Sequence, residues 1–242
     1  MWFFISPESV SDSQVLLRGP EAHHMASVLR KKEGESVELF DGKGRCLSGR
    51  ILEAGGDFVR IKIDKDKVEP FVGPKVVLGQ SLAKGEKIDW VIQKGTEIGV
   101  SEIYLIEGER AVVHPKESSK GRKEERWQRI AVEACKQSQQ PYVPVVHGIV
   151  SLQGFLEKAS NVAERIFFWE RSEQQPKAYF RSLSKIPSEI WIAIGPEGGW
   201  SDAEVEMAHR NRFMDLSLGR SILRTETAAI AALSMIRYEF SV

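Results

Sequence analysis

The feature that most constrains the fold is a set of apolar segments after residue 72. These segments do not alternate apolar with polar residues, and they lie at 76–78, 103–106, 166–169 and 190–194. Strands buried on both faces of a parallel sheet show this pattern. Stretches with helical periodicity lie between or after them, at 85–98, 118–139, 151–160 and 201–211. The alternation of strands and helices predicts an open α/β sheet.

The first 72 residues follow another pattern. Short segments at 36–40, 47–52 and 58–63 have the composition of strands joined by tight turns, and 22–31 resembles a short helix. Such a succession favours a small β-barrel. Pro70, Gly73 and Pro74 then indicate a linker. We therefore expect two domains, at 1–72 and 73–242.

Composition excludes several classes of protein. Lys and Arg total 34 and so do Asp and Glu, so the chain is not uniformly basic, although a local basic patch remains open. Cys46 and Cys135 lack the spacing of a disulfide framework or a metal site. No apolar run approaches the roughly 20 residues that span a bilayer, and the N-terminus lacks a basic signal-peptide region. We expect a cytoplasmic protein that uses neither a metal nor a membrane.

A glycine-rich loop at 195–199 directly follows the apolar segment 190–194. Ser201 and Glu204 behind the loop have the spacing of a capping box, which predicts that a helix begins there. Loops at this end of a parallel strand bind ligands in open α/β sheets, and glycine lets the backbone approach a ligand closely. The loop matches neither G-x-G-x-x-G nor a Walker motif. An ordinary tight turn before a capped helix is the alternative interpretation.

A second loop, at 219–227, follows an expected strand at 213–218 and precedes an apolar stretch at 228–236. A helix that is apolar nearly all round is buried on several sides. The partner is either the rest of this chain or a second subunit. Thr225 is expected as the N-cap of this helix. Arg224 is unfavourable beside the positive helix start, which makes it a functional candidate.

These two loops resemble those of the SPOUT superfamily of methyltransferases, and more closely those of bacterial small-subunit (16S) ribosomal RNA uridine-N3 methyltransferases. The matching segments are 194–201 and 218–228, supported by 93–100, 125–127 and 133–138. The resemblance covers nearly the whole chain. It implies a PUA-like β-barrel, followed by an α/β domain with a deep trefoil knot. It also implies a homodimer formed through the knot domain and its last helix.

The resemblance further implies a pocket for S-adenosylmethionine between the two loops. The candidate cofactor-binding residues are Trp169, Glu170, Gly195, Pro196, Glu197, Gly198, Gly199, Leu218, Gly219, Ser221, Ile222, Leu223 and Thr225. The implied macromolecular partner is 16S ribosomal RNA or the small ribosomal subunit.

The expected helix at 118–139 carries a basic stripe opposite its apolar face. Arg122, Arg126, Arg129, Glu133 and Lys136 share this polar face. A solvated, salt-bridged helix surface is one interpretation. With RNA as the implied substrate, the candidate phosphate contacts are Arg122, Arg126 and Arg129, with Lys94, Arg110 and Arg30 in addition.

Methylation of uracil N3 requires removal of a proton or stabilisation of the imide anion. Arg224 is the candidate that stabilises charge on a uracil carbonyl oxygen, and Glu197 either accepts the proton or fixes its loop. Two alternatives remain at this point. One is another SPOUT RNA methyltransferase that modifies a ribose 2′-oxygen, and the other is a non-catalytic RNA-binding protein of ribosome assembly.

Overall fold

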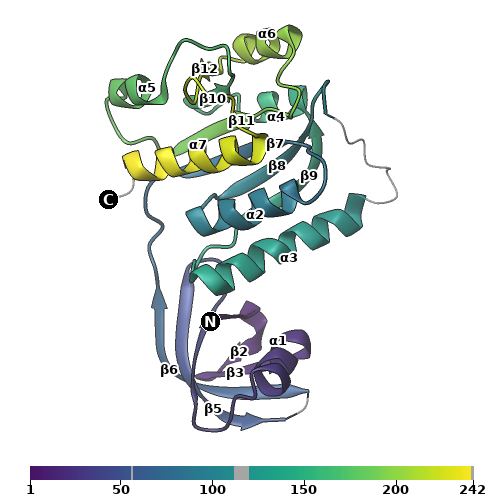
Figure 1. Ribbon diagram of the computed structural model, residues 1–242. Helices are drawn as coiled ribbons and strands as arrows, with labels where there is room; N and C mark the ends of the chain where they lie inside the picture. Colours follow the sequence, from purple (N-terminus) through teal and green to yellow (C-terminus); the bar gives the residue numbers. More distant parts are fainter. Residues whose placement is uncertain (56, 112–119, 241–242) are drawn as a thin grey trace. The chain divides into compact units, whose positions relative to one another are not determined.

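The structure is a computed structural model that describes residues 1–55, 57–111 and 120–240 (Figure 1). The chain forms two compact units. The N-terminal unit comprises Met1–Phe71 and Val132–Val143, and the C-terminal unit comprises Val72–Ala131 and Pro144–Val242. The boundary at residue 71 lies next to the predicted one. The segment 132–143 differs from the prediction, because it packs with the N-terminal unit.

The N-terminal unit contains a six-stranded sheet in the order β1-β4-β5-β6-β3-β2. Its strands are β1 (Phe3–Phe4), β2 (Val10–Ser11), β3 (Gln14–Arg18), β4 (Ser36–Phe40), β5 (Arg45–Ala54) and β6 (Phe58–Val68). Neighbouring strands are antiparallel, except that β1 pairs parallel with β4. The three predicted strands are confirmed as β4, β5 and β6, and the last two are longer than expected.

The turn between β4 and β5 follows directly from its sequence. Asp41 Oδ1 accepts hydrogen bonds from the backbone N–H of Lys43 at 2.7 Å and of Arg45 at 3.1 Å. Gly42 and Gly44 have φ angles of +75° and +99°, which residues other than glycine rarely adopt. This Asx turn fixes the register of the β4–β5 pair.

Strands β1, β2 and β3 were not predicted, because the first two contain only two residues each and β3 is short. The predicted helix at 22–31 is replaced by two short turns of helix. These are α1 (Gly19–His23) and the π-helical η2 (His24–Val28), with the 3₁₀ turn η1 (Pro7–Ser9) earlier in the chain. The helical segment ends at Val28, and Arg30 has a φ of +52°, which no helix continues through.

The end of helix α3 (Lys120–Ser138) belongs to the N-terminal unit. Cys135 packs there with Phe40 and Cys46 in one apolar cluster. The side chain of Lys136 is only 2% exposed, and its Nζ bonds to Glu21 at 2.8 Å and to Glu133 at 2.9 Å. The prediction that Lys136 lies on a solvent-exposed face was therefore wrong. Two carboxylates around its ammonium group make the burial possible.

The C-terminal unit contains a second six-stranded sheet, in the order β12-β10-β11-β7-β8-β9, in which all neighbours are parallel. Its strands are β7 (Lys75–Ser81), β8 (Glu102–Glu107), β9 (Val145–Ser151), β10 (Glu164–Phe168), β11 (Glu189–Ile194) and β12 (Met214–Leu216). The four apolar segments form β7, β8, β10 and β11, which are buried on both faces as predicted. The half-exposed edge strand β9 was missed, because it lacks such a run.

Helices cover both faces of this sheet. They are α2 (Lys87–Ile98), α4 (Leu152–Lys158), α5 (Pro176–Ser182), α6 (Asp202–Arg210) and α7 (Thr225–Phe240), with the first part of α3. Phe155 of α4 and Val205 of α6 share a core cluster with Val77, Trp191 and Phe167 of the strands. Helices α2 and α7 lie side by side, and α7 contacts β7 and β11 (Figure 1). The short helix α5 was not predicted.

Candidate active site

The first glycine loop joins the buried end of β11 to α6. The predicted capping box is confirmed: Ser201 Oγ accepts from the Glu204 N–H at 3.2 Å, and Glu204 Oε2 accepts from the Ser201 N–H at 2.8 Å. Glu204 is buried, and its other oxygen accepts from the Glu109 N–H at 2.8 Å. The start of α6 is thereby held to the segment that follows β8.

Two glycines in this loop are required by close approaches. A Cβ atom on Gly195 would lie 3.0 Å from Nε1 of Trp200, which itself donates to the Phe168 carbonyl oxygen at 3.1 Å. Gly199 has a φ of +69°, and a Cβ atom there would lie 2.9 Å from an oxygen of Glu170. Larger residues at either position would displace the loop or these neighbours.

The second loop runs from β12 to α7 and is tied to the first. Gly219 has a φ of +120°, and no atom lies within 4 Å of the place that its Cβ would occupy. Thr225 is the first residue of α7, so its predicted N-cap role was wrong. Its hydroxyl instead donates to the Gly195 carbonyl oxygen at 2.6 Å and accepts from Nε2 of the buried Gln80 at 2.8 Å. Thr225 therefore links the two loops to the end of β7.

A cavity of about 430 Å³ lies between the two loops, at the carboxyl ends of β10, β11 and β12. All the residues predicted to hold the cofactor line this cavity, and so does Arg224. The structure adds wall residues that sequence reasoning missed, namely Phe168, Ile194, Trp200, Ser217 and Ala228. Four of them directly adjoin predicted residues, and Ala228 lies in the first turn of α7. Sequence reasoning assigned the ends of the strands and the start of the helix to the core, and so left these residues out.

The walls of the cavity suit a ligand that is both apolar and hydrogen-bonding. Ile194, Leu218 and Leu223 supply apolar surface, and the glycines leave backbone groups accessible. The buried Nε1 of Trp169 has no hydrogen-bond partner among the described residues. A buried donor without a partner is costly, and a ligand acceptor would satisfy it. The guanidinium carbon of Arg171 lies 5.2 Å above the same ring.

Glu197 is held by the start of α2. Its Oε1 accepts from Lys87 Nζ at 2.9 Å and from the Lys84 N–H at 3.2 Å. Burial alone would raise the pKa of Glu197, but these hydrogen bonds outweigh it and hold the pKa below its usual value. Lys87 Nζ also lies 3.9 Å from Glu226 of α7. With its lowered pKa, the Glu197 carboxylate is a weak proton acceptor. This favours the interpretation that Glu197 fixes its loop. Sequence reasoning missed Lys87.

Arg224 is exposed at the wall of the cavity, immediately before α7. Its backbone carbonyl accepts from the Ala228 N–H at 2.8 Å and so belongs to the first turn of the helix. Its guanidinium makes no hydrogen bond or ion pair with any other described residue. The planar fork of donors is thus available to a substrate oxygen.

Arg110 has a different role from the one predicted for it. Its guanidinium donates to the carbonyl oxygens of Gly198 at 3.2 Å and Trp200 at 3.4 Å, so it supports the first loop without lining the cavity. These bonds occupy Arg110, which makes it a poorer candidate for a phosphate contact. The structure therefore favours Arg110 as a residue that shapes the cavity.

The other residues predicted to contact RNA fall into two groups, those that form ion pairs within the protein and those that do not. Lys94 pairs with Glu97 at 2.8 Å within α2, and Arg126 makes a bidentate ion pair with Asp89. Arg122 and Arg129 are exposed on α3, and neither pairs with another described residue. Arg30 is exposed on the N-terminal unit. Among residues 1–55, 57–111 and 120–240, Arg122, Arg129 and Arg30 are thus the candidates whose guanidinium groups have no partner.

Residues 1–55, 57–111 and 120–240 contain neither a candidate metal site nor a candidate membrane-spanning helix. No group of three His, Cys, Asp or Glu side chains there could hold a metal ion. Within the same residues, no helix combines the length and the apolar character that crossing a membrane requires.

Comparison with known families defines the class. A family model described as RNA methyltransferase domain matches residues 72–237, and one described as RNA methyltransferase PUA domain matches residues 17–64. The fold is therefore that of an RNA methyltransferase, with a PUA-like half-barrel sheet followed by the all-parallel sheet of a SPOUT methyltransferase domain.

Similar proteins narrow the class to one family. Ribosomal RNA small subunit methyltransferase E of Bacillus subtilis (strain 168) is 34% identical over 237 residues, covering 92% of this chain and 89% of the relative. The Neisseria gonorrhoeae enzyme of the same name, solved with S-adenosyl methionine, superposes with a TM-score of 0.87 at 29% identity, over 98% of this chain and 96% of that one. A Legionella pneumophila structure with bound cofactor SAM has a TM-score of 0.89 at 29% identity, with the same coverage. This chain belongs to the ribosomal RNA small subunit methyltransferase E family.

Proposed function

We propose that this chain transfers the methyl group of S-adenosylmethionine to N3 of one uridine in 16S ribosomal RNA, the uridine numbered 1498. The observation that carries the proposal is the cavity between the two glycine loops, with Arg224 in its wall. Related structures contain S-adenosylmethionine, and relatives bear the name of a small-subunit ribosomal RNA methyltransferase.

The residues of the cavity fit the cofactor. Backbone groups of Gly195, Gly199, Leu218 and Leu223 would hold it, and the unpartnered Nε1 of Trp169 would donate to one of its acceptors. Glu170, beside Gly199, is the candidate acceptor for hydroxyl groups. When bound, the cofactor supplies an electrophilic methyl group on a sulfonium centre.

The protein's own task is to prepare the uracil. The target base must leave its stack, because N3 lies at the pairing edge. Arg224 directs its guanidinium to a uracil carbonyl oxygen and stabilises the negative charge that grows there as N3 loses its proton. Glu197, already ionised and bonded to Lys87, keeps the first loop in place. The proton therefore leaves to solvent or to a group other than Glu197.

Labelled methyl transfer tests the proposal against its alternatives. Small ribosomal subunits lacking the modification are incubated with the purified protein and cofactor that carries a labelled methyl group. Label on a uracil base is the expected result. Label on a ribose oxygen would assign a 2′-oxygen methyltransferase, and RNA binding without label would assign a non-catalytic assembly protein.

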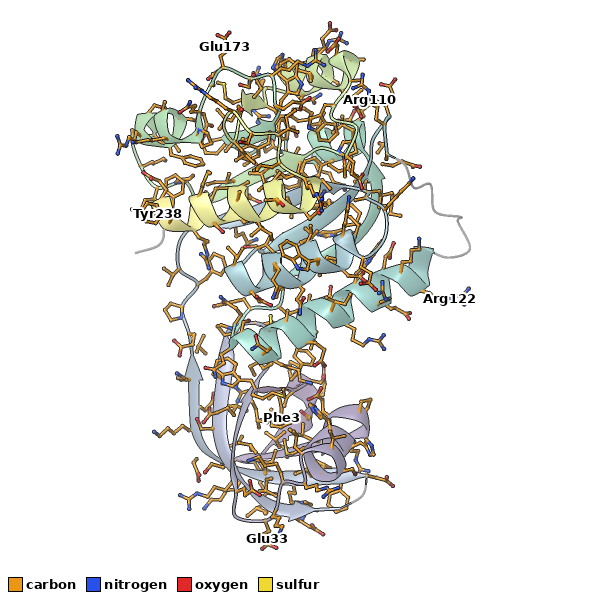
Figure 2. All side chains as sticks on the ribbon, viewed as in Figure 1. Phe3, Glu33, Arg110, Arg122, Glu173 and Tyr238 are labelled. Atoms are coloured by element: carbon orange, nitrogen blue, oxygen red, sulfur yellow. The ribbon has the colours of Figure 1, made fainter. Side chains whose placement is uncertain are left out.

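The proposal includes a homodimer formed through the C-terminal domain. The trefoil knot in that domain stays a prediction. One stripe of α7 is left uncovered by the residues that the structure describes: Met235 is 39% exposed and Tyr238, which Figure 2 labels, is 88% exposed. Ile230 is also partly exposed, but five residues separate it from Met235, so it lies on another side of the helix. Ile236, in contrast, is fully buried within the chain. A second subunit would cover the exposed stripe.

These exposures predict distinct outcomes for two substitutions in α7. Met235→Asp should yield a folded monomer, because the charge faces water once the partner leaves. Ile236→Asp should unfold the chain, because an unpaired charge would be buried within it. Sedimentation and thermal melting measure the two outcomes, with Lys158→Asp on α4 as the control. A monomeric wild-type protein at micromolar concentration would contradict the dimer.

The proposal also assigns a cellular location to the protein and a role to its N-terminal unit. A substrate in the small ribosomal subunit places the protein in the cytoplasm. The N-terminal unit is proposed to bind RNA, consistent with its match to the PUA model of RNA methyltransferases.

A further inference from the structure

The sheet of the N-terminal unit has an outer face that is partly uncovered. Side chains alternate along its strands, so Val15, Leu17, Val59 and Ile61 point into the core. Their neighbours point outward. At one end, the outward Phe40 and Cys46 are covered by Cys135 of α3. Beyond Ser48, the residues of β3, β5 and β6 on the same side are half-buried or exposed.

Cations dominate this uncovered part, which we name the outer basic face. It is defined by five exposed side chains, Arg18, Arg50, Arg60, Lys62 and Lys65. Strand pairing sets them beside one another: Lys62 lies opposite both Arg50 of β5 and Gln14 of β3, and Lys65 lies opposite Ser48. Alternate residues along a strand are roughly 6.6 Å apart, so Arg60 and Lys62 form an ordered row.

Nearby carboxylates neutralise only part of this charge. Asp64 pairs with Arg50 at 3.1 Å, and Glu53 lies 3.9 Å from Arg60. Glu38 accepts a hydrogen bond from Ser48 Oγ at 2.8 Å. The side chains of Arg18, Lys62 and Lys65 make no hydrogen bond or ion pair with any described residue. The uncompensated charge of the face is therefore positive.

Apolar side chains lie between these cations. Leu16 lies opposite Arg60, and Phe58 lies opposite Arg18. Both are half-buried, and Leu52 at the end of β5 is 38% exposed. A nucleic acid backbone has regularly spaced phosphate charges with sugars between them. A row of cations separated by small apolar areas is complementary to such a backbone.

We propose that the outer basic face docks the sugar–phosphate backbone of the RNA substrate, with Arg18, Lys62 and Lys65 as its phosphate contacts. This inference rests on the proposed function, because the partner is the RNA that is methylated. The face reads no sequence, since phosphate contacts position a protein but do not specify bases. It holds the substrate while the cavity of the C-terminal unit selects the uridine.

The salt dependence of RNA binding tests this inference. The triple variant Arg18→Gln/Lys62→Gln/Lys65→Gln should bind small ribosomal subunits more weakly. The slope of log affinity against log salt should fall by about one unit per lost contact. The KM for RNA should rise several-fold, whereas the saturated rate and the cofactor Kd should stay unchanged. All three residues are exposed, and a thermal melt checks the fold.

Matched variants make the outcome decisive. Lys158→Gln/Lys177→Gln/Lys185→Gln removes the same charge from the C-terminal unit and should leave the slope unchanged. Arg18→Lys/Lys62→Arg/Lys65→Arg keeps the charge and should bind as the wild type does. An unchanged slope in the first variant, or an equal loss in the control, would overturn the inference. So would binding to phosphatidylserine vesicles that depends on this face while RNA binding does not.

The inference and the proposed function fail separately. If the wild-type protein binds RNA through this face but transfers no methyl group, the proposed function falls and the docking surface stands. If methylation proceeds with the same KM for RNA in the variant, the docking surface falls and the proposed function stands.

Discussion

Arg224→Ala is expected to lower the single-turnover rate of methyl transfer by about 10²–10³-fold, the usual cost of removing one donor to a developing oxyanion. The guanidinium lies in the cavity wall without a partner among the described residues, so no internal ion pair holds it away from the substrate. Affinities for RNA and for the cofactor should barely change, because the interaction strengthens only as N3 loses its proton.

Two further variants sharpen this test. Arg224→Lys keeps the charge but loses the planar fork, so the rate should remain strongly reduced. Arg220→Ala, an exposed neighbour in the same loop that does not line the cavity, should leave the rate unchanged. If Arg224→Ala weakens RNA binding and leaves the saturated rate intact, Arg224 is a binding residue only.

The pH dependence follows from the same assignment. The wild-type rate should rise with pH until the target imide ionises, because the anion is the better nucleophile. Glu197 contributes nothing to this rise. The pKa of Glu197 is lowered from its usual value, so its carboxylate is already ionised throughout the neutral range. Replacing it by Gln should therefore leave the shape of the pH profile unchanged.

The second large effect concerns the cofactor. Gly219→Val is expected to abolish binding of S-adenosylmethionine in the absence of RNA. The φ of +120° at this position is rarely adopted by L residues, so the loop must move to accept a side chain. The new side chain would enter open space beside the cavity, where no protein atom lies within 4 Å of its Cβ. Calorimetry measures the loss.

Gly34→Val is the matched control for strain alone. Gly34 also has a positive φ, of +85°, and no atom lies within 4 Å of the place that its Cβ would occupy, but it belongs to the N-terminal unit. The substitution should lower the melting temperature without changing the affinity for the cofactor. Wild-type affinity in Gly219→Val would remove Gly219 from the pocket assignment.

The sequence predicts the parts of this protein that depend on local signals. The buried strands β7, β8, β10 and β11 contain continuous apolar runs, and the capping box at Ser201 and Glu204 marks the start of α6. The two glycine loops follow strands, and in a parallel sheet the ends of neighbouring strands meet at one edge. This geometry predicts that both loops lie at a ligand-binding edge, but the individual cavity residues were predicted only through the resemblance to the SPOUT methyltransferases.

Long-range partners could not be predicted in the same way. Lys136 has the position of a solvent-exposed residue on its helix, and one of the two carboxylates that make its burial possible is Glu21, which is distant in the sequence. Lys87 begins α2, yet its ammonium group bonds to Glu197 in another loop and helps to lower the pKa of that carboxyl. The polar face of α3 carries an excess of basic residues, but the sequence does not reveal that Asp89 of α2 pairs with Arg126. Each case depends on a contact between segments that are distant in the sequence. Hydrophobic periodicity describes one segment at a time, so it does not predict such contacts.

Mass spectrometry of ribosomal RNA tests the central claim most directly. Small subunits from cells without the gene are incubated with purified protein and cofactor that carries an isotopically labelled methyl group, and the RNA is digested and sequenced by mass. The expected result is one labelled methyl group on the base of a single uridine of 16S RNA, at N3, which Arg224→Ala forms about 10²–10³-fold more slowly under single-turnover conditions. Label on a ribose, on another base or on no nucleotide would contradict the assignment.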